Sequence, residues 1–227
     1  MKTLSLALAG CLALGAPSAS ALTNLVVNGD FEAGNSGFSS DYLLSFPNNG
    51  EGQYFVGTNA QAWNSNLIAN PDHTEGDGGL MFLGNGSSAA LPVWFSSDAI
   101  PVSSDTDYFF EAWVMNLCCR PGTLGNGVDP VGPSVLSFYA NDELLGTRSS
   151  SELGVWEPLS TIWSSGSATS VVLRLVNSNT GFRGNDFAVD DIFLGTETSV
   201  PEPGTALLIL GGLGAVAARG RSRRAAD

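Results

Sequence analysis

Short apolar runs alternate with polar turn residues over most of this chain, and no helical apolar repeat of useful length is present. Val171, Leu173 and Leu175 share one side of an extended chain while Arg174 lies on the other, the period of two typical of a half-buried strand. Gly, Asn, Asp, Ser and Pro separate the runs. Strands are predicted at Leu25–Val27, Gln53–Gly57, Leu80–Leu83, Leu91–Phe95, Tyr108–Asn116, Val135–Ala140, Thr161–Trp163, Val171–Asn177 and Phe187–Leu194.

Eight or nine strands within roughly 175 residues favour an all-β fold, a two-sheet jelly-roll β-sandwich over residues 22–195. Asn141, Asp142 and Glu143 are predicted to form a hairpin turn, because they place turn-forming side chains between two apolar runs. Residues 196–199 are interpreted as a linker.

The first 21 residues differ from this body and predict an export signal. Lys2 supplies a positive start, Leu4–Ala16 an apolar segment, and Ala19-Ser20-Ala21 a cleavage site with small residues. An alternative is lipid attachment at Cys11, since Leu8-Ala9-Gly10-Cys11 also fits a lipobox. That reading leaves an apolar segment at the lower limit of the usual length. A permanent anchor is disfavoured because the segment is too short to span a bilayer.

The last 28 residues form a second distinct segment, 200–227. Thr205–Ala218 contains no charge and would be about 21 Å long as a helix, against a hydrocarbon core of about 30 Å. It is therefore marginal as a permanent anchor. The segment begins with Val200, Pro201, Glu202, Pro203 and Gly204, and a basic tail follows with Arg219, Arg221, Arg223 and Arg224.

These three parts, in this order, resemble the PEP-CTERM sorting signal of Gram-negative bacteria. The resemblance implies recognition and cleavage near Pro201-Glu202-Pro203 by an exosortase, a membrane enzyme associated with exopolysaccharide production. The hydrophobic helix would insert transiently in the inner membrane, with the arginines on the cytoplasmic side. The processed protein would then reach the outer surface or the extracellular space. An ordinary single-span anchor is the alternative.

The net charge of residues 22–199, the body of the chain, limits the classes of partner that it can bind. Between residues 22 and 199 there are four arginines, no lysine and 20 acidic residues, a formal charge of −16. Nucleic acid and anionic lipid are excluded as partners, because binding phosphates requires clustered Lys and Arg. Divalent cations, neutral glycans or plain solubility suit such a surface.

Three stretches of the body resemble the galactose-binding-like β-sandwich of exported PEP-CTERM proteins and carbohydrate-binding modules. They are "LVVNGDFE" at 25–32, "PDHTEGDGGLMFL" at 71–83 and "GNDFAVDDIFLG" at 184–195. The resemblance implies a structural Ca²⁺. Its ligands would be the carbonyl of Asp30, Glu32, the Asp77 region, and Asp190 or Asp191.

The chemistry of adjacent aspartates supports this implication. Ca²⁺ takes six to eight oxygen ligands. An ionised carboxylate buried without compensation costs several kcal/mol, so Asp190 or Asp191 requires a partner. Two alternatives to Ca²⁺ could also stabilise the carboxylate. The end of the strand could be exposed to solvent, or Arg183 or Arg174 could supply a positive charge. Asp186 is predicted to cap the turn at Gly184-Asn185.

An enzyme is not expected, because no catalytic signature is present. His73 is the only histidine, and it is predicted to order its loop through hydrogen bonds rather than act as a base. Paired carboxylates could in principle cleave glycosides, which leaves a glycan-cleaving enzyme as a remote alternative.

Tryptophans are candidates for stacking on sugar rings. Trp113 stands among Phe109, Phe110 and Val114 and is predicted to be core. Trp63 lies in the polar stretch "NAQAWNSN" and is the best candidate for an exposed glycan contact.

Cys118 and Cys119 are adjacent, and their Cα atoms would be about 3.8 Å apart across a trans peptide, below the usual disulfide range of about 4.4 to 6.8 Å. Export to an oxidising compartment favours an oxidised state. A vicinal disulfide, a bridge to another chain and two buried thiols remain open. A zinc site is not expected, because two thiolates and one distant histidine are fewer than the four ligands that such a site usually requires.

The sequence therefore predicts an exported, non-catalytic protein that uses the export machinery and an exosortase as partners. Its expected role is structural or adhesive, in contact with extracellular polysaccharide in an exopolysaccharide or biofilm setting. The alternative is a carbohydrate-binding module that recognises a specific glycan.

Overall fold

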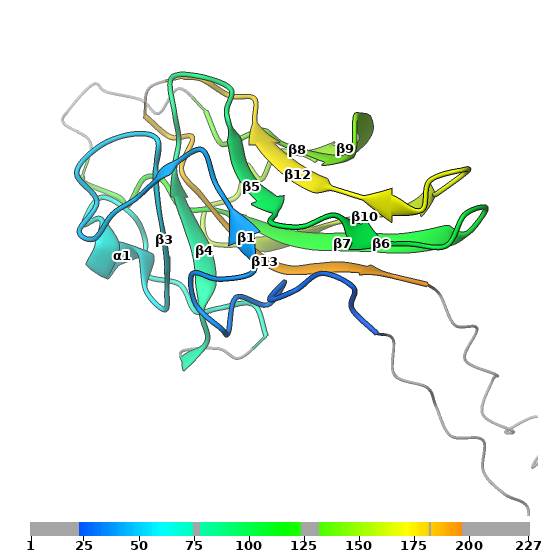
Figure 1. Cartoon of the computed structure of the whole chain (residues 1–227). Helices are drawn as coiled ribbons and strands as arrows, with labels where there is room; N and C mark the ends of the chain where they lie inside the picture. Colours follow the sequence, from blue (N-terminus) through cyan, green and yellow to red (C-terminus); the bar gives the residue numbers. More distant parts are fainter. Residues whose placement is uncertain (1–22, 75–77, 124–131, 182, 197–227) are drawn as a thin grey trace, which may run out of the picture. The chain divides into compact units, whose positions relative to one another are not determined.

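The computed structural model describes residues 23–74, 78–123, 132–181 and 183–196, all within the unit Leu22–Glu197. Strands account for most of the regular structure (Figure 1). The short helix α1 spans Ala60–Trp63. The strands are β1 Phe38–Ser39, β2 Leu43–Leu44, β3 Gln53–Gly57, β4 Met81–Asn85, β5 Pro92–Ser96, β6 Ile100–Pro101, β7 Asp107–Asn116, β8 Leu136–Ala140, β9 Glu143–Arg148, β10 Trp156–Ser164, β11 Ser170–Val171, β12 Leu173–Asn177 and β13 Phe187–Gly195.

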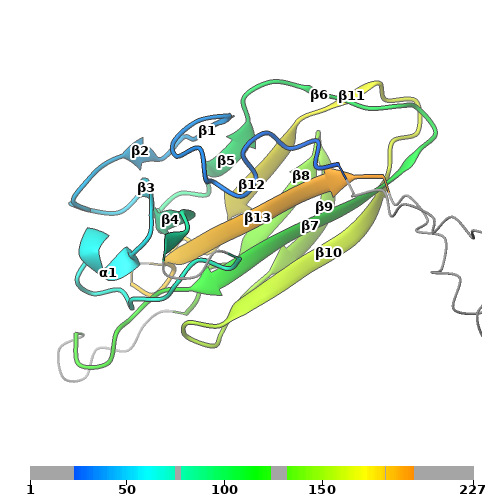
Figure 2. The ribbon, with the colours of Figure 1, turned by 90° about the horizontal axis from the view of Figure 1, so that it is seen from below.

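Two sheets form a β-sandwich, as the sequence predicted. One sheet has the order β1-β5-β12-β8-β9, and the other has the order β10-β7-β13-β4-β3-β2. Figure 1 shows the two sheets as layers, and Figure 2 shows β13, β7 and β10 side by side in the six-stranded sheet. The pairings within the sheets are antiparallel except for β2 with β3. Strands β6 and β11 form a separate pair.

The main core lies between the two sheets, where strand alternation puts apolar side chains on the inner faces. In β7 the residues Tyr108, Phe110, Ala112 and Val114 are buried, while Phe109, Glu111 and Trp113 between them are more exposed. Leu173 and Leu175 of β12 face them from the other sheet and belong to the same core. Burying each large apolar side chain contributes about 1.5 to 3 kcal/mol.

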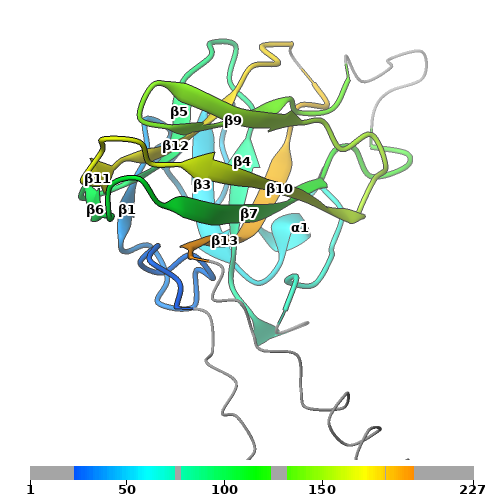
Figure 3. The ribbon, with the colours of Figure 1, turned by 90° about the vertical axis from the view of Figure 1, so that its right-hand side faces the viewer.

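A second apolar cluster covers part of the outer face of the six-stranded sheet. We call it the outer cluster. Its members come from α1, the segment after it, β4, β7 and β13, and α1 lies where β7 ends and β13 begins (Figure 3). The side chain of Asn59 caps the helix by accepting from Ala62 N–H. The buried members are Ala60, Trp63, Leu67, Met81, Leu83, Met115, Leu117, Cys118 and Ala188.

Most predicted strands are present, and β3 has the predicted bounds. The turn between β8 and β9 begins at Asn141, as predicted. The strand predicted at Leu25–Val27 is wrong, because the side chain of Asn24 takes the place of ladder bonds there. Its Oδ1 accepts from Val26 N–H and Leu194 N–H, at 3.0 and 3.1 Å.

Strand β9 and helix α1 were not predicted. The residues of β9 are exposed or half-buried, so apolar and polar positions do not alternate clearly along this strand. The four residues of α1 are too few to show a helical period. Within the described residues, no helix combines the length and apolar character needed to span a bilayer. The export signal, the hydrophobic C-terminal helix and the sorting motif lie outside the described residues.

Candidate functional site

A pocket of about 720 Å³ lies beside α1 at one end of the sandwich. Five segments that are distant in the sequence form its walls: the turn before β3, the segment 61–66, the end of β4, the residues after β7 and the residues before β13. Asparagine is the commonest side chain in the lining. No local sequence pattern indicates this pocket, because it exists only where these five segments meet.

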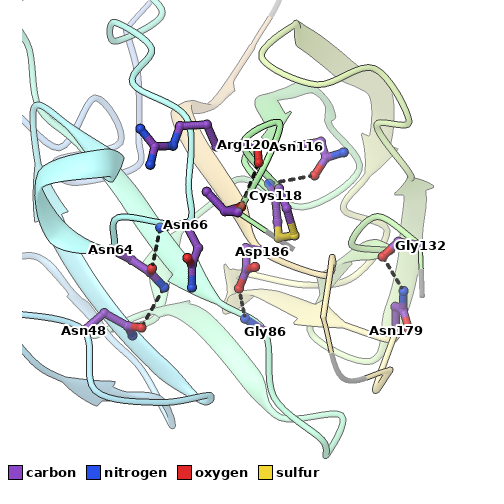
Figure 4. Close-up of a disulfide and its surroundings, with 12 residues drawn as sticks. Asn48, Asn64, Asn66, Gly86, Asn116, Cys118, Arg120, Gly132, Asn179 and Asp186 are labelled. Atoms are coloured by element: carbon purple, nitrogen blue, oxygen red, sulfur yellow. Dashed lines mark hydrogen bonds between the residues drawn. A yellow bond between two sulfur atoms is a disulfide. The ribbon is translucent and has the colours of Figure 1, made fainter. Parts of the chain in front are cut away.

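Asparagine side chains hold one wall of the pocket in place. Asn48 Oδ1 accepts from the Nδ2 groups of Asn64 and Asn85, at 2.9 and 2.8 Å. Asn64 Oδ1 accepts from the backbone N–H of Asn66 at 3.0 Å. The backbone N–H of Arg120 donates to the carbonyl of Asn66, which ties this wall to the segment after β7 (Figure 4). The wall is therefore fixed before any ligand arrives.

Cys118 and Cys119 are joined by a disulfide and both line the pocket (Figure 4). The peptide between them is cis, and their Cα atoms are 2.9 Å apart rather than the trans spacing assumed from the sequence. Asn116 Oδ1 accepts from Cys118 N–H at 3.2 Å. Cys118 is buried and Cys119 is half-buried, and together with Pro47, Ala62 and Trp63 they supply the apolar part of the lining.

Two carboxyl groups also line the pocket. Asp186 is 7% exposed, and its Oδ1 accepts from Gly86 N–H at 3.1 Å rather than capping the turn at Gly184-Asn185, so that prediction was wrong. Burial raises the pKa of Asp186 to about 7, with a smaller contribution from the charge of Glu51. Burial also raises the pKa of Glu51, opposed by a hydrogen bond from the backbone of Arg183. The pocket is therefore acidic in composition, with its deeper carboxyl partly protonated near neutral pH.

Trp63 is not an exposed glycan contact, and that prediction was wrong. The side chain is 1% exposed and packs in the outer cluster, although it forms part of the pocket wall. Its Nε1 donates to the carbonyl of Ser45 at 2.7 Å. The polar neighbours that suggested exposure have structural roles, since Asn59 caps α1 and Asn64 belongs to the asparagine wall.

The aspartates of β13 find their partners in the segment around His73. Asp190 Oδ2 accepts from His73 N–H at 3.2 Å, and Asp191 Oδ2 lies 2.6 Å from His73 Nδ1. The hydroxyl of Thr74 also donates to Asp191. Burial raises the pKa of Asp190 to about 10, with further contributions from a hydrogen bond with Asp72 and from neighbouring negative charges. His73 thus orders its loop, and the partners found for the two aspartates are the backbone and side chains of this segment.

A β-bulge in β13 explains how the side chains of both Asp190 and Asp191 reach the segment around His73. The register of β13 against β7 shifts between Asp190 and Phe193, and Asp191 has a φ of 47°. Strict alternation would have sent the two side chains to opposite faces. The sequence showed the adjacent acids, but a bulge depends on pairing with the neighbouring strand.

Trp113 is partly exposed, so its predicted core position was wrong. Its ring stacks on His73 with 3.9 Å between centroids and 22° between planes. Trp156 meets His73 edge-on, and its Nε1 donates to the carbonyl of Pro71 at 3.2 Å. Both tryptophans thus hold the segment that carries His73 against the outer face of the six-stranded sheet.

The predicted calcium ligands are only partly brought together. Ile192 N–H donates to the carbonyl of Gly29 at 2.8 Å, which joins the N-terminal turn to the bulge of β13. Glu32 Oε1 accepts from Leu80 N–H at 2.6 Å, and Asp30 Oδ1 accepts from Glu32 N–H at 3.4 Å. Asp77 lies outside the described residues. Across the described ranges, no three His, Cys, Asp or Glu side chains form a group able to hold a metal ion.

Comparison with solved structures shows weak similarity to several β-sandwich domains. The carbohydrate-binding module TmCBM61, solved in complex with β-1,4-galactotriose, is 14% identical, with a TM-score of 0.47 over 77% of this chain and 99% of that one. The CBM22-1 xylan-binding domain from Paenibacillus barcinonensis Xyn10C is 14% identical, with a TM-score of 0.43 over 79% and 97%. A cyclase from Fischerella sp. TAU is 13% identical, with a TM-score of 0.41 over 64% and 76%.

Similarities this weak do not transfer the ligand or activity of those proteins to this chain. No curated protein matches the chain. The sorting signal is a different case, because residues 199–224 match the family model of the PEP-CTERM protein-sorting motif. The chain therefore carries a PEP-CTERM sorting motif, which marks it as a secreted substrate of an exosortase.

Proposed function

We propose that the β-sandwich is a non-catalytic, carbohydrate-binding adhesive domain that exosortase processing delivers to the cell surface or the extracellular polysaccharide matrix. The observation that carries this proposal is the pocket beside α1, whose fixed amide wall and carboxyl groups offer closely spaced donors and acceptors. Such groups suit a ligand with many hydroxyls, because each hydroxyl both donates and accepts. The sorting motif supports the surface location.

One feature of the structure favours binding over catalysis, and one supports the second candidate. His73 is held by Asp191 and by stacking on Trp113, which suits a structural role better than proton transfer. Glu51 and Asp186 line one pocket, and this pair is the observation that supports a glycan-cleaving enzyme as the second candidate. Incubating the domain with oligosaccharides and looking for shortened products separates the two candidates.

Processing is tested by the intact mass of the protein recovered from its native host, with and without the exosortase gene. We expect the residues after about Val200 to be lost only when the exosortase is present, and any added mass would identify an attached group. A full-length C-terminus in both strains would contradict the processing part of the proposal.

Binding by the body is tested by co-sedimenting the processed protein with polysaccharide purified from the same host. We expect saturable sedimentation that excess soluble polysaccharide reverses. Sedimentation no greater than that of an unrelated acidic protein would contradict the adhesive role, whatever happens at the sorting motif.

We also propose that Ca²⁺ binds beside the N-terminal turn. The turn contacts the bulge of β13, and carboxylates from Asp72, Asp190 and Asp191 lie nearby in the same strand and loop. These side chains are chemically suited to Ca²⁺ but make an incomplete ligand set within the described residues, and the predicted ligand Asp77 lies outside them.

Glu32→Ala tests this calcium proposal. We expect a larger fall in melting temperature in Ca²⁺ than in EDTA, because only the first condition adds loss of an ion to loss of the bond to Leu80 N–H. Asp142→Ala is the control, since Asp142 is an exposed acid in the turn between β8 and β9, which belong to the other sheet. Equal falls in both conditions would assign the effect to the Leu80 hydrogen bond alone and refute the metal role.

A further inference from the structure

The disulfide between Cys118 and Cys119 contributes apolar surface to a pocket whose lining is mixed. The two sulfur atoms and their β-carbons lack strong hydrogen-bonding groups, and sulfur is soft and polarizable. The surrounding wall holds amide and carboxyl groups as well as the apolar side chains of Pro47, Ala62 and Trp63, and Asn66 is exposed. A sugar ring has the matching character, with C–H groups on its faces and hydroxyls around its rim.

Asp186 provides an independent indication of a ligand. The side chain is more than nine-tenths buried and forms part of the pocket lining, and its Oδ1 accepts from Gly86 N–H. Within the described part of the chain, Oδ2 accepts no hydrogen bond. This oxygen is not fully enclosed by the protein, so it is open to the pocket, where a hydroxyl of a ligand or of solvent can donate to it.

The lining also limits the charge of the ligand. Glu51 and Asp186 line the pocket together with Arg183, and the body as a whole is strongly acidic. An anionic sugar would meet two carboxyl groups, whereas a neutral one would meet donors and acceptors without net repulsion. The volume of about 720 Å³ is within the usual range of about 300 to 1,000 Å³ for small-ligand sites.

We infer that this pocket binds a neutral sugar residue of an oligosaccharide. One face of the sugar ring lies against the Cys118–Cys119 disulfide, and a hydroxyl donates to Asp186 Oδ2. Asn66 contacts the rim from the open side, and the bonded wall of Asn48, Asn64 and Asn85 keeps the pocket in shape. This inference rests on the proposed function and names its ligand class and its site.

Isothermal titration calorimetry of the processed protein with cellotriose, mannotriose, xylotriose, galactotriose and trigalacturonate tests the inference. We expect at least one neutral trisaccharide to bind and the anionic one not to bind. Asp186→Asn should weaken binding about tenfold or more, because the amide keeps a bond with Gly86 but replaces the charge-assisted hydrogen bond between the carboxylate and the sugar hydroxyl with a weaker neutral one. Asp98→Asn is the matched control and should change affinity less than about twofold.

A second variant guards against misfolding of the first. Asn66 is exposed, and Asn66→Ala should weaken the same sugar while leaving the melting temperature unchanged. The Cys118→Ser, Cys119→Ser double variant should lose binding and still unfold cooperatively. Full affinity in Asp186→Asn and Asn66→Ala, or in the double cysteine variant, would overturn the assigned pocket, as would preference for trigalacturonate.

The titration and the sedimentation assay fail in distinguishable ways. If no trisaccharide binds but the protein still sediments with host polysaccharide, the pocket inference is overturned and the adhesive proposal stands. If neither assay shows binding, both are overturned. Binding accompanied by shortened products would replace the adhesive role with the glycan-cleaving one.

Discussion

Replacing Asp186 with asparagine should change how the stability of this protein depends on pH. Burial raises the pKa of the Asp186 carboxyl from its ordinary 3.8 to about 7. Between these values the unfolded chain has released the proton and the folded chain still holds it, so folding stability falls as pH rises. The difference between these two pKa values, at about 1.4 kcal/mol per pH unit, corresponds to a loss of about 4 kcal/mol in folding stability. This loss is complete above about pH 7.

Asp186→Asn removes the titrating group and keeps an acceptor for Gly86 N–H. The stability of the variant relative to the natural protein should therefore rise by about 4 kcal/mol between about pH 4 and about pH 7. Urea unfolding followed by tryptophan fluorescence at several pH values measures this difference, with Asp98→Asn as the exposed control. Asp190 is present in all three proteins, so its titration does not contribute to the stability differences between them. A difference that does not vary with pH would refute the reasoning.

Three further changes test other parts of the structure. Gly29→Ala should cost more than about 2 kcal/mol in urea unfolding, because a β-carbon would collide with the backbone carbonyl of Ile192, and a loss below about 0.5 kcal/mol would contradict that contact. Trp63→Ala should lower the free energy of unfolding by about 3 to 5 kcal/mol, since the side chain is buried. Nearly unchanged stability would instead indicate that Trp63 is exposed. Alkylating the denatured, unreduced protein should leave Cys118 and Cys119 unmodified by mass spectrometry, and modification of either would rule out the disulfide.

The candidate pocket could not be found from the sequence, although several of its residues attracted attention. Trp63, Cys118, Cys119 and Asp186 were each interpreted by their neighbours along the chain. Their common location follows from pairing among β3, β4, β7 and β13, which brings distant segments to one end of the sandwich. No local pattern records which loops will meet.

The two misplaced tryptophans have one cause. Trp113 was assigned to the core from its apolar neighbours along the chain, whereas alternation along β7 puts its side chain on the opposite face from Phe110 and Val114. Helix α1 and its following segment cover one end of the outer face, so Trp63 is buried there. Trp113 lies beyond that cover and stacks on His73 instead.

The sequence by itself determined what depends on neighbouring residues: the all-β character, most strand positions, the turn at Asn141, and the sorting motif at 199–224. Alternation and turn chemistry are local, and a sorting enzyme recognises a linear segment. The tertiary structure alone decided the bulge that turns Asp190 and Asp191 toward His73, and the pocket that joins Asp186 to the disulfide. These features arise from contacts between strands and loops far apart in the chain, where burial and pairing outweigh local preference.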